Sequence, residues 1–466
     1  MNWKSILYDN LPAPLQNLAV STYGLGWQRR RFGGLFEAHL QSFRQRDGWS
    51  ESQFLDYQTM GLRKVLKHAF DTVPYYKKRW KEVGITTSKL EAFELQNLPQ
   101  LPLLEKADLR TYCTSDLSSS SPQKHGQFFA SSGSTGTPVK ILFSHLMHQH
   151  WTAAVEARVR NWAGITRSHR RGTIGGRRVV PRGNAPAPYY RYNFIEKQVY
   201  FSAYHISPQT TRNYLQGMFD HKVEYMTGYA SGNFLLARNI EIAGFEAPEL
   251  KAVLTSSEKL TANMRAVFEK VYGCRTFDAW SGVEACSLVS ECEHGSLHVS
   301  PDVGIMEFIN PTTGSKARPG EPAEVVCTGL LNFDQPLVRY RIGDLMVYSE
   351  RKCTCGRSMP VIDEIIGRQE DIIEGPDGRQ MVRFHSIFID LPSIQEAQVI
   401  QHHRSEFEIK VVCTASLDEK TKRILKQKMV SQLGPVQVEI VQVNQIPRAA
   451  NGKFKAVISH LKDTLG

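Results

Sequence analysis

The chain has 466 residues, of which 41% are hydrophobic, 10% aromatic and 22% charged, a composition typical of a globular protein about three domain lengths long. Its 57 Lys and Arg residues outnumber 46 Asp and Glu residues and give a net charge of +11, which favours anionic ligands but is spread too evenly for a nucleic-acid-binding arm. No apolar stretch of 18 residues occurs, and Asp9, Asn10 and Pro12 interrupt the amino terminus before a signal peptide could form. We therefore expect a cytoplasmic protein with small-molecule ligands, no nucleic-acid partner and no membrane span.

The first 125 residues or so are predicted to be a helical lead-in. Apolar residues recur at helical spacing from Leu62 to Phe70, before a break at Pro74. From Gln127 the pattern changes to short apolar runs between turns and amphipathic helices, such as residues 261–272, which Gly273 would end. This alternation predicts an α/β layered body over residues 1–367.

The composition becomes charged and glycine-rich near Gly367, in the segment GRQEDIIEGPDGRQ. Beyond it we expect an alternating strand through Phe407, Ile409 and Val411, a helix that buries Leu425 and Met429, and a final strand, VQVEIVQV. Residues 368–466 are therefore predicted to form a separate, small α+β domain.

A loop rich in hydroxyls and glycine follows a short apolar strand at Phe128 and Phe129. Backbone N–H and hydroxyl groups in such a loop can turn toward phosphate oxygens without a bulky side chain in the way. It is not a Walker loop, because no G-x-x-x-x-G-K-[ST] run is present. From composition alone a flexible loop is equally open. The residues concerned are Ser131, Ser132, Gly133, Ser134, Thr135, Gly136 and Thr137.

Three later segments add nucleotide-binding chemistry. In residues 278–284, Trp280 could stack on a purine, and Glu284, four residues later, could hold Mg²⁺. In residues 339–344, Asp344 is expected to end a strand and to suit two ribose hydroxyls. In residues 447–453, Lys453 lies on a glycine-containing turn. Together with the loop at residues 131–137, they predict a nucleotide site distributed along the chain.

These segments in this order resemble the adenylate-forming superfamily of acyl-CoA synthetases, in its phenylacetate-CoA ligase-like branch. The resemblance runs from about Leu62 to Lys455 and includes HAFDTVPYYKKRW, LPLLEKADLR, SSGSTGTP, TSSEKL, PLVRYRIGDL, GRQEDII and IPRAANGKFK. It implies a large multi-layer adenylating domain with a small domain on a hinge. It also implies a two-step reaction, in which a carboxylate attacks the α-phosphate of ATP and a thiol then attacks the acyl-adenylate.

The resemblance further implies roles for individual residues. The loop at residues 131–137 would hold the β- and γ-phosphates, Glu284 the Mg²⁺ ion and Asp344 the ribose. Lys453 would bridge the adenylate phosphate and the substrate carboxylate. The remaining assignments are Ser257 and Glu258, which with Trp280 would flank the adenine, Arg368, near the ribose and phosphates, and Glu370 or Asp371, as the hinge pivot.

The chain departs from the family pattern at two of these places. The usual Tyr-Gly-x-Ser/Thr-Glu is Trp280-Ser281-Gly282-Val283-Glu284 here, so the hydroxyl before the glutamate is missing and the glycine is displaced by one. Either the loop shifts or Ser281 supplies the hydroxyl. At the pivot, usually Asp or Lys, the chain has Glu370 followed by Asp371, and which of them turns stays open.

Two cysteine clusters predict a metal site. Eight cysteines are few for a secreted disulfide scaffold, so clustered ones are interpreted as thiols or metal ligands. Cys292 follows the Glu284 loop, and Cys353 and Cys355 lie on a later turn. With one histidine they would complete a closed Zn²⁺ shell, which is structural because it has no position for water. His298 is preferred to His294, narrowly, because it begins an apolar strand; unrelated buried thiols are the alternative.

The acceptor and the acid stay open at this stage. The implied partners are a small carboxylic acid, ATP with Mg²⁺, and CoA. A carrier protein, an amine or a sugar could accept the acyl group in place of CoA. A third possibility is a zinc-stabilised binding protein without turnover. The basic segment at residues 167–182 is a solvated loop by default, or a cradle for the phosphates of CoA or for another anionic acceptor. Residues 225–231 resemble an acyl-pocket wall. Monomer and homodimer are both open.

Overall fold

The computed structural model describes residues 7–120, 126–130, 139–177, 179–181, 186–368, 373–377, 380–381, 387–388, 391, 393–413, 415–447 and 455–461. The chain divides into two compact units, the larger comprising residues 1–342 and 346–365 and the smaller residues 343–345 and 366–466. The mixed α/β fold with a separate carboxyl-terminal domain, which the sequence predicted, is confirmed. None of the described helices is long and apolar enough to cross a membrane.

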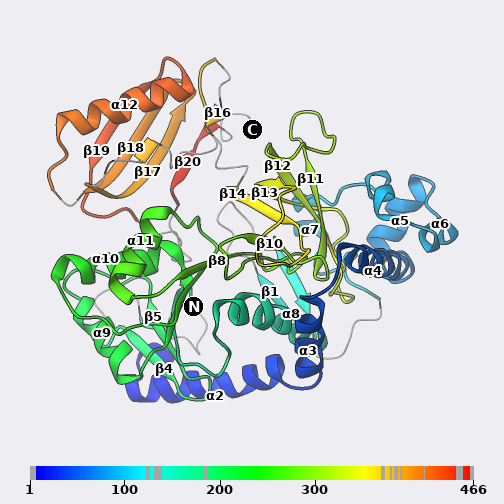
Figure 1. The fold of residues 1–466 in the computed structure, drawn as a ribbon, viewed down its shortest axis with the longest axis horizontal. Coiled ribbons are helices and arrows are strands. Elements are labelled where there is room, and N and C mark those ends of the chain that lie inside the picture. Colours follow the sequence, from blue (N-terminus) through cyan, green and yellow to red (C-terminus); the bar gives the residue numbers. More distant parts are fainter. Residues whose placement is uncertain are drawn as a thin grey trace. The chain divides into compact units, whose positions relative to one another are not determined.

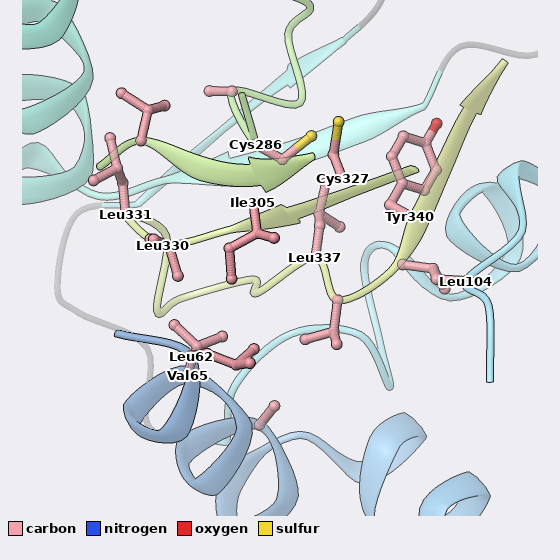
Figure 2. Packing of buried hydrophobic residues seen from close by; sticks show 14 of the residues in the cluster. Leu62, Val65, Leu104, Cys286, Ile305, Cys327, Leu330, Leu331, Leu337 and Tyr340 are labelled. Atoms are coloured by element: carbon pink, nitrogen blue, oxygen red, sulfur yellow. The ribbon is translucent and has the colours of Figure 1, made fainter. Parts of the chain in front are cut away.

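The lead-in is helical, as predicted. Helix α4 begins with a capping box, in which the Ser50 hydroxyl accepts from the Gln53 amide and the Gln53 side chain accepts from the Ser50 amide. Figure 2 shows Leu62 and Val65 of this helix within the main hydrophobic core, in the same cluster as Ile305 and Leu330. The elements are α2 (Ala13–Phe32), α3 (Phe36–Arg46), α4 (Glu51–Thr72), α5 (Pro74–Glu82), α6 (Thr87–Glu91), the 3₁₀ helix η1 (Leu95–Gln100) and α7 (Lys106–Tyr112).

A twelve-stranded sheet forms the centre of the larger unit, in the order β11-β12-β13-β14-β10-β9-β8-β7-β6-β3-β5-β4. Strands β5, β3, β6, β7 and β8 run parallel, and α9, α10 and α11 gather beside them (Figure 1). The strands are β3 (Arg171–Gly175), β4 (Tyr190–Asn193), β5 (Gln198–Ser202), β6 (Tyr225–Tyr229), β7 (Ala252–Ser256), β8 (Thr276–Trp280), β9 (Val289–Glu291), β10 (Leu297–Val299), β11 (Gly304–Ile309), β12 (Pro322–Gly329), β13 (Tyr340–Ser349) and β14 (Val361–Arg368).

The helices of this body are α8 (His145–Val155), α9 (Thr211–Asp220), α10 (Ala230–Ala243) and α11 (Ala262–Tyr272). Helix α11 begins and ends where the sequence predicted: the Thr261 hydroxyl caps it, and Gly273 follows it at φ +64°, a left-handed conformation that glycine adopts without steric cost. A π-helical turn, η2 (Glu156–Arg160), and a 3₁₀ turn, η3 (Asn161–Ala163), continue directly from α8. Strands β1 (Gln127–Ala130) and β2 (Lys140–Phe143) form a separate antiparallel pair.

In the smaller unit, α12 (Glu419–Leu433) accompanies a four-stranded sheet ordered β19-β18-β17-β20. Its strands are β17 (Ile394–His403), β18 (Glu406–Cys413), β19 (Gln437–Gln442) and β20 (Val457–Ser459), and a two-stranded pair, β15 (Ile373–Glu374) and β16 (Gln380–Met381), precedes them. Phe407, Ile409 and Val411 are buried with Met429, as their spacing predicted.

Two sequence-based expectations are wrong in this part of the chain. The VQVEIVQV strand is not the last, because β20 follows it and pairs in parallel with β17; three residues are too short a run to reveal a strand by alternation. Asp344 does not end a strand, because β13 continues to Ser349. Gly343, which suggested a turn there, has φ +83° inside the strand.

Candidate active site and metal centre

A pocket of about 190 Å³ lies where strands β6, β7 and β8 approach their carboxyl ends, the edge at which open α/β sheets bind ligands. One side consists of strand-end residues, among them Trp280. The other consists of α8 and η2, whose Trp151, Val155 and Val159 make it largely apolar. The lining residues are Trp151, Val155, Val159, Arg160, Thr227, Leu254, Thr255, Ser256, Ala279, Trp280, Ser281 and Leu288.

Of the three residues expected around an adenine, only Trp280 lines this pocket. Ser256 lines it in place of Ser257, which follows β7 with φ +69°. The Glu258 carboxylate accepts the backbone N–H of Ser231 at 2.8 Å, in the first turn of α10. That contact neutralises the positive end of the helix dipole, so Glu258 helps to hold α10 in place.

Glu284, the expected Mg²⁺ ligand, is 5% exposed, and the Tyr340 hydroxyl lies 3.4 Å from its Oε1. Its Oε2 lies so close to Gly282 that a Cβ atom there would approach it to 2.2 Å. This close approach gives a physical reason for glycine at 282, one place later than the family pattern has it. The Ser281 hydroxyl donates to the Ser287 carbonyl at 2.8 Å, which fixes the turn.

Only some of the remaining residues predicted to bind the nucleotide lie within the part of the chain that the structure describes. Asp344 is buried on β13, and Arg368 is the last residue of β14, with its side chain outside the described part. Residues 131–137, Glu370, Asp371 and Lys453 lie outside the described residues. The strands that flank the 131–137 loop are paired, with Ala130 opposite Lys140.

Sequence reasoning missed an ion pair in the pocket wall. Nη1 of Arg160 lies 2.8 Å from Oε2 of Glu156, and the two side chains are only 16% and 2% exposed. Burial alone would lower the pKa of Arg160, but the neighbouring Tyr225 hydroxyl and Glu156 carboxylate outweigh it and raise the pKa, so the guanidinium stays charged. The only signal in the sequence is an i, i+4 pair of opposite charges, the usual pattern of a solvated helix face.

A second missed group is Asp278 on β8. Burial raises its pKa, the nearby Glu291 carboxylate adds to the effect, and the pKa reaches about 7. The Thr255 hydroxyl and the Ala279 amide donate to its Oδ1 at 3.2 Å and 3.0 Å. Arg265 binds Glu291 through both carboxylate oxygens. This network ties β8 to β9, directly behind the pocket.

The metal-binding residues predicted from the cysteine spacing converge. The ligand atoms of Cys292, His298, Cys353 and Cys355 all lie within 4.8 Å of one another. The Sγ atoms of Cys292 and Cys353 are 3.8 Å apart, and Nε2 of His298 is 3.4 Å from Sγ of Cys355. Ligands at 2.0–2.3 Å from a tetrahedral Zn²⁺ ion are separated by about 3.4 to 3.8 Å, so this donor set fits zinc.

The surroundings of the cluster orient its histidine. Nδ1 of His298 lies 3.1 Å from the Met359 carbonyl, which can only accept, so Nδ1 carries the hydrogen and Nε2 faces the sulfurs with its lone pair. His294 is exposed and its Nδ1 pairs with the Thr354 hydroxyl at 2.9 Å. Of the two candidate histidines, the structure therefore places His298 with the thiols.

The pKa values of Cys292 and Cys353 are shifted in opposite directions. Burial raises the pKa of Cys292 to about 11. Burial also acts to raise the pKa of Cys353, but hydrogen bonds from Ser296 and from Cys355 outweigh it and lower the pKa to about 6. A cation would compensate the charge that thiolates bring into this apolar environment, which includes Trp162 and Phe54.

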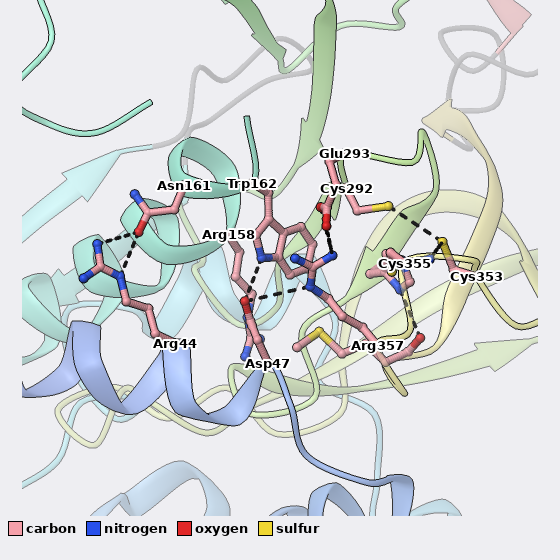
Figure 3. A network of polar contacts seen from close by, with 12 residues as sticks. Arg44, Asp47, Arg158, Asn161, Trp162, Cys292, Glu293, Cys353, Cys355 and Arg357 are labelled. Atoms are coloured by element: carbon pink, nitrogen blue, oxygen red, sulfur yellow. Dashed lines mark hydrogen bonds and ion pairs between the residues drawn. The ribbon is translucent and has the colours of Figure 1, made fainter. Parts of the chain in front are cut away.

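A polar network adjoins the metal centre, as Figure 3 shows. The Arg357 guanidinium lies 4.4 Å from the ring centroid of Trp162, whose Nε1 donates to Asp47 at 2.8 Å. Arg158 joins Asp47 and is bound to the fully buried Asp302. Trp162 also meets His298 edge-on, at 5.9 Å between ring centroids. The segment that lines the pocket at Val159 and Arg160 thus continues, two residues later, to a contact with the cysteine–histidine cluster.

Three described arginines of the basic segment contact other parts of the protein, whereas the Arg170 side chain is exposed. Arg167 lies over the rings of Phe32 and Phe36, and Arg177 over those of Tyr23 and Tyr200. Arg171 is buried on β3 beside Gln198. Arg178 and Arg182 lie outside the described residues. The arrangement of the described members favours a structural role over a phosphate cradle.

Comparisons with known proteins agree with this architecture. A family model of the CapK C-terminal domain matches residues 374–460. The chain is 22% identical to Protein CapK of Staphylococcus aureus, over 98% of this chain and 99% of that protein. It is 26% identical to a phenylacetate-coenzyme A ligase of Pseudomonas putida, over 68% of this chain and 71% of that protein.

Among solved structures, 2-hydroxyisobutyryl-CoA ligase in the postadenylation state, in complex with 2-HIB-AMP, matches with a TM-score of 0.71 at 19% identity and covers 90% of this chain and 92% of that chain. The resemblance that the sequence motifs indicated is therefore confirmed: the chain is similar in sequence to phenylacetate-CoA ligases, and its fold matches that of 2-hydroxyisobutyryl-CoA ligase.

Proposed function

We propose that this protein activates a carboxylic acid with ATP to an acyl-adenylate and transfers the acyl group to CoA, releasing pyrophosphate and AMP. The observation that carries this proposal is the pocket at the ends of β6, β7 and β8, with Trp280 in its wall, in a fold shared with a ligase solved with an acyl-adenylate. The similarity to phenylacetate-CoA ligases supports the same chemistry. The enzyme is then an AMP-forming acid–thiol ligase.

In this proposal the larger unit supplies most of the nucleotide contacts. Trp280 stacks on the adenine, with Ser257 and Glu258 nearby, and residues 131–137 hold the β- and γ-phosphates. Glu284 binds Mg²⁺; its carboxylate is buried and positioned by Tyr340 and Gly282, as a metal ligand requires. Asp344 binds the ribose, and Arg368 lies near the ribose and phosphates.

Lys453 supplies the charge for the first step. A carboxylate that attacks a polyanion develops negative charge, and a preorganised donor that meets this charge contributes roughly 3 to 4 kcal/mol to transition-state stabilisation. Because Lys453 belongs to the smaller domain, residues 368–466, closure about Glu370 or Asp371 would bring it to the adenylate and opening would free the site for thiol attack.

Exchange of labelled pyrophosphate into ATP, measured with a panel of organic acids, tests the first step. Acid-dependent exchange is expected, and Lys453→Ala should reduce it by roughly 10² to 10³ while thioester formation from supplied acyl-adenylate continues. Equal loss in both half-reactions would contradict the role of Lys453. Absence of exchange with every acid would favour a binding protein without turnover.

A second candidate function differs from the first in the molecule that accepts the acyl group. The family model over residues 374–460 is that of CapK. The sequence similarity to Protein CapK covers 98% of the chain and that to the Pseudomonas putida phenylacetate-coenzyme A ligase covers 68%, while the fold match to a CoA ligase covers 90%. The alternative is transfer of the acyl group to an amine, a sugar or a carrier protein. Release of AMP that depends on CoA supports the ligase, and adenylate that accumulates with CoA present supports the alternative.

We also propose that Cys292, His298, Cys353 and Cys355 hold one structural Zn²⁺ ion. Three sulfurs and one nitrogen at tetrahedral spacing fill its coordination shell. When bound, the ion would join the turn at Cys353 to the ends of β9 and β10. It supplies no step of the reaction.

A further inference from the structure

Arg160 is the one charged residue among those that line the described pocket, and it forms an ion pair with the buried Glu156. Oε2 of Glu156 accepts from Arg160, and Oε1 accepts the Arg167 amide at 2.6 Å. Both carboxylate oxygens thus already have a donor. The Tyr225 hydroxyl also neighbours the Arg160 guanidinium. A guanidinium carries five N–H groups, so donors remain on Arg160 beyond those directed at Glu156 and Tyr225.

The pair requires an explanation because a largely apolar pocket would hold a plain hydrocarbon acid without it. Burying an ion pair costs desolvation that its own attraction only roughly repays, so such a pair is weak evidence for stability. It lies in η2, a π-helical turn, and turns of this type occur frequently at functional sites. The turn allows Val155, Val159 and Arg160 to line the same wall.

We infer that Arg160 binds a neutral oxygen, a hydroxyl or carbonyl, on the body of the acid that this pocket receives; the inference rests on the proposed function. A second carboxylate on the acid is disfavoured because Glu156 already balances the charge of Arg160. Because Trp280 is assigned to the adenine, the acid occupies the part of the pocket that α8 and η2 line. The substrate class is therefore an organic acid with a hydroxyl or carbonyl substituent.

Matched acids that differ by one oxygen test this inference. Phenylacetate is compared with its three ring-hydroxylated forms, and 2-methylpropanoate with 2-hydroxyisobutyrate. Binding is measured by calorimetry without ATP, and kcat/KM by pyrophosphate exchange. The wild type should prefer the oxygenated member of at least one pair by about 10- to 100-fold, the contribution of one hydrogen bond to a charged group.

The variants isolate the guanidinium. Arg160→Met alone would leave Glu156 buried and unpaired, so the informative variant is Arg160→Met combined with Glu156→Gln. It should abolish the preference while it still binds the unsubstituted acid. Val159→Ala, in the same wall, is the matched control and should change the affinity for both acids of a pair by the same factor.

The outcomes separate the two proposals. A preference that survives in the double variant, or a wild type that binds no oxygenated acid better than its partner, overturns the role of Arg160. If oxygenated acids bind with the predicted preference but no acid supports exchange, the adenylation proposal fails and the role of Arg160 in binding stands. A dicarboxylic acid that binds best would also overturn the inference, since Glu156 already balances the charge of Arg160.

Discussion

Removal of the metal from the proposed zinc centre is the most direct test of the site. Fully buried His298 uses Nδ1 to hold the Met359 carbonyl and presents Nε2 to the sulfurs, whereas His294 is exposed and contacts Thr354. Purified protein should contain about one zinc ion per chain, measured by elemental analysis. His298→Ala should lose the ion and His294→Ala should keep it.

The expected size of the effect follows from linkage. A ligand present at about a thousand times its Kd stabilises the folded state by about 4 kcal/mol, and structural zinc in small peptides binds with apparent free energies of roughly 10 to 16 kcal/mol. Chelation should therefore lower the stability of the wild type by at least about 4 kcal/mol. The shift is about 2 to 4 °C per kcal/mol for a domain of about 150 to 250 residues and smaller for a larger unit, so the melting temperature should fall by at least several degrees.

The same chelator separates metal loss from lost packing. His298→Ala should melt lower than the wild type with or without chelator, because it has already lost the ion and a buried side chain. The free energy of unfolding of His294→Ala should lie within about 1 kcal/mol of the wild-type value. Chelator should destabilise this variant as much as it destabilises the wild type. Wild-type protein that is metal-free, or that melts at the same temperature with and without chelator, would refute the site and leave four cysteine and histidine side chains that merely pack together.

Three further predictions concern groups that the structure places around the pocket. Burial raises the pKa of Asp278 to about 7 from an ordinary 3.8, so between these pH values the folded state holds a proton that the unfolded state has lost, and the free energy of unfolding should fall as pH rises from about 4 to 7. Asp278→Asn should remove that pH dependence, measured by urea titration, and should be more stable than the wild type at pH 8 by at most about 4 kcal/mol. An unchanged pH dependence in the variant would assign it to other groups. Asp302 is fully buried between Arg46 and Arg158, so Asp302→Asn should destabilise the larger unit by about 3 to 5 kcal/mol; a loss under 1 kcal/mol would mean that water reaches the pair. Gly282→Ala would force a Cβ atom to 2.2 Å from the Glu284 carboxylate, so it should reduce acid-dependent pyrophosphate exchange, while Gly26→Ala, with no atom within 4 Å of the new Cβ, should leave exchange unchanged.

Local patterns determined much of the architecture. The helical spacing from Leu62 to Phe70 and the stop at Gly273 depend on interactions within a few residues, so they are legible without tertiary information. The cysteine spacing, the apolar strand at His298 and the family resemblance together indicated the four residues that converge. The order of the nucleotide motifs predicted the resemblance that the comparisons confirm.

What only the tertiary structure decided is which of these local features are buried and what they meet. Glu156 and Arg160 have the spacing of a solvated pair. In the folded protein both side chains are buried, and Arg160 lines the pocket while it is paired with Glu156. Asp278 acquires its raised pKa from burial and from Glu291 on the next strand. The position of Gly282, a departure in the sequence, is explained by the approach of Glu284. Each effect depends on desolvation or contact between residues brought together by folding, and composition and spacing carry no information on either.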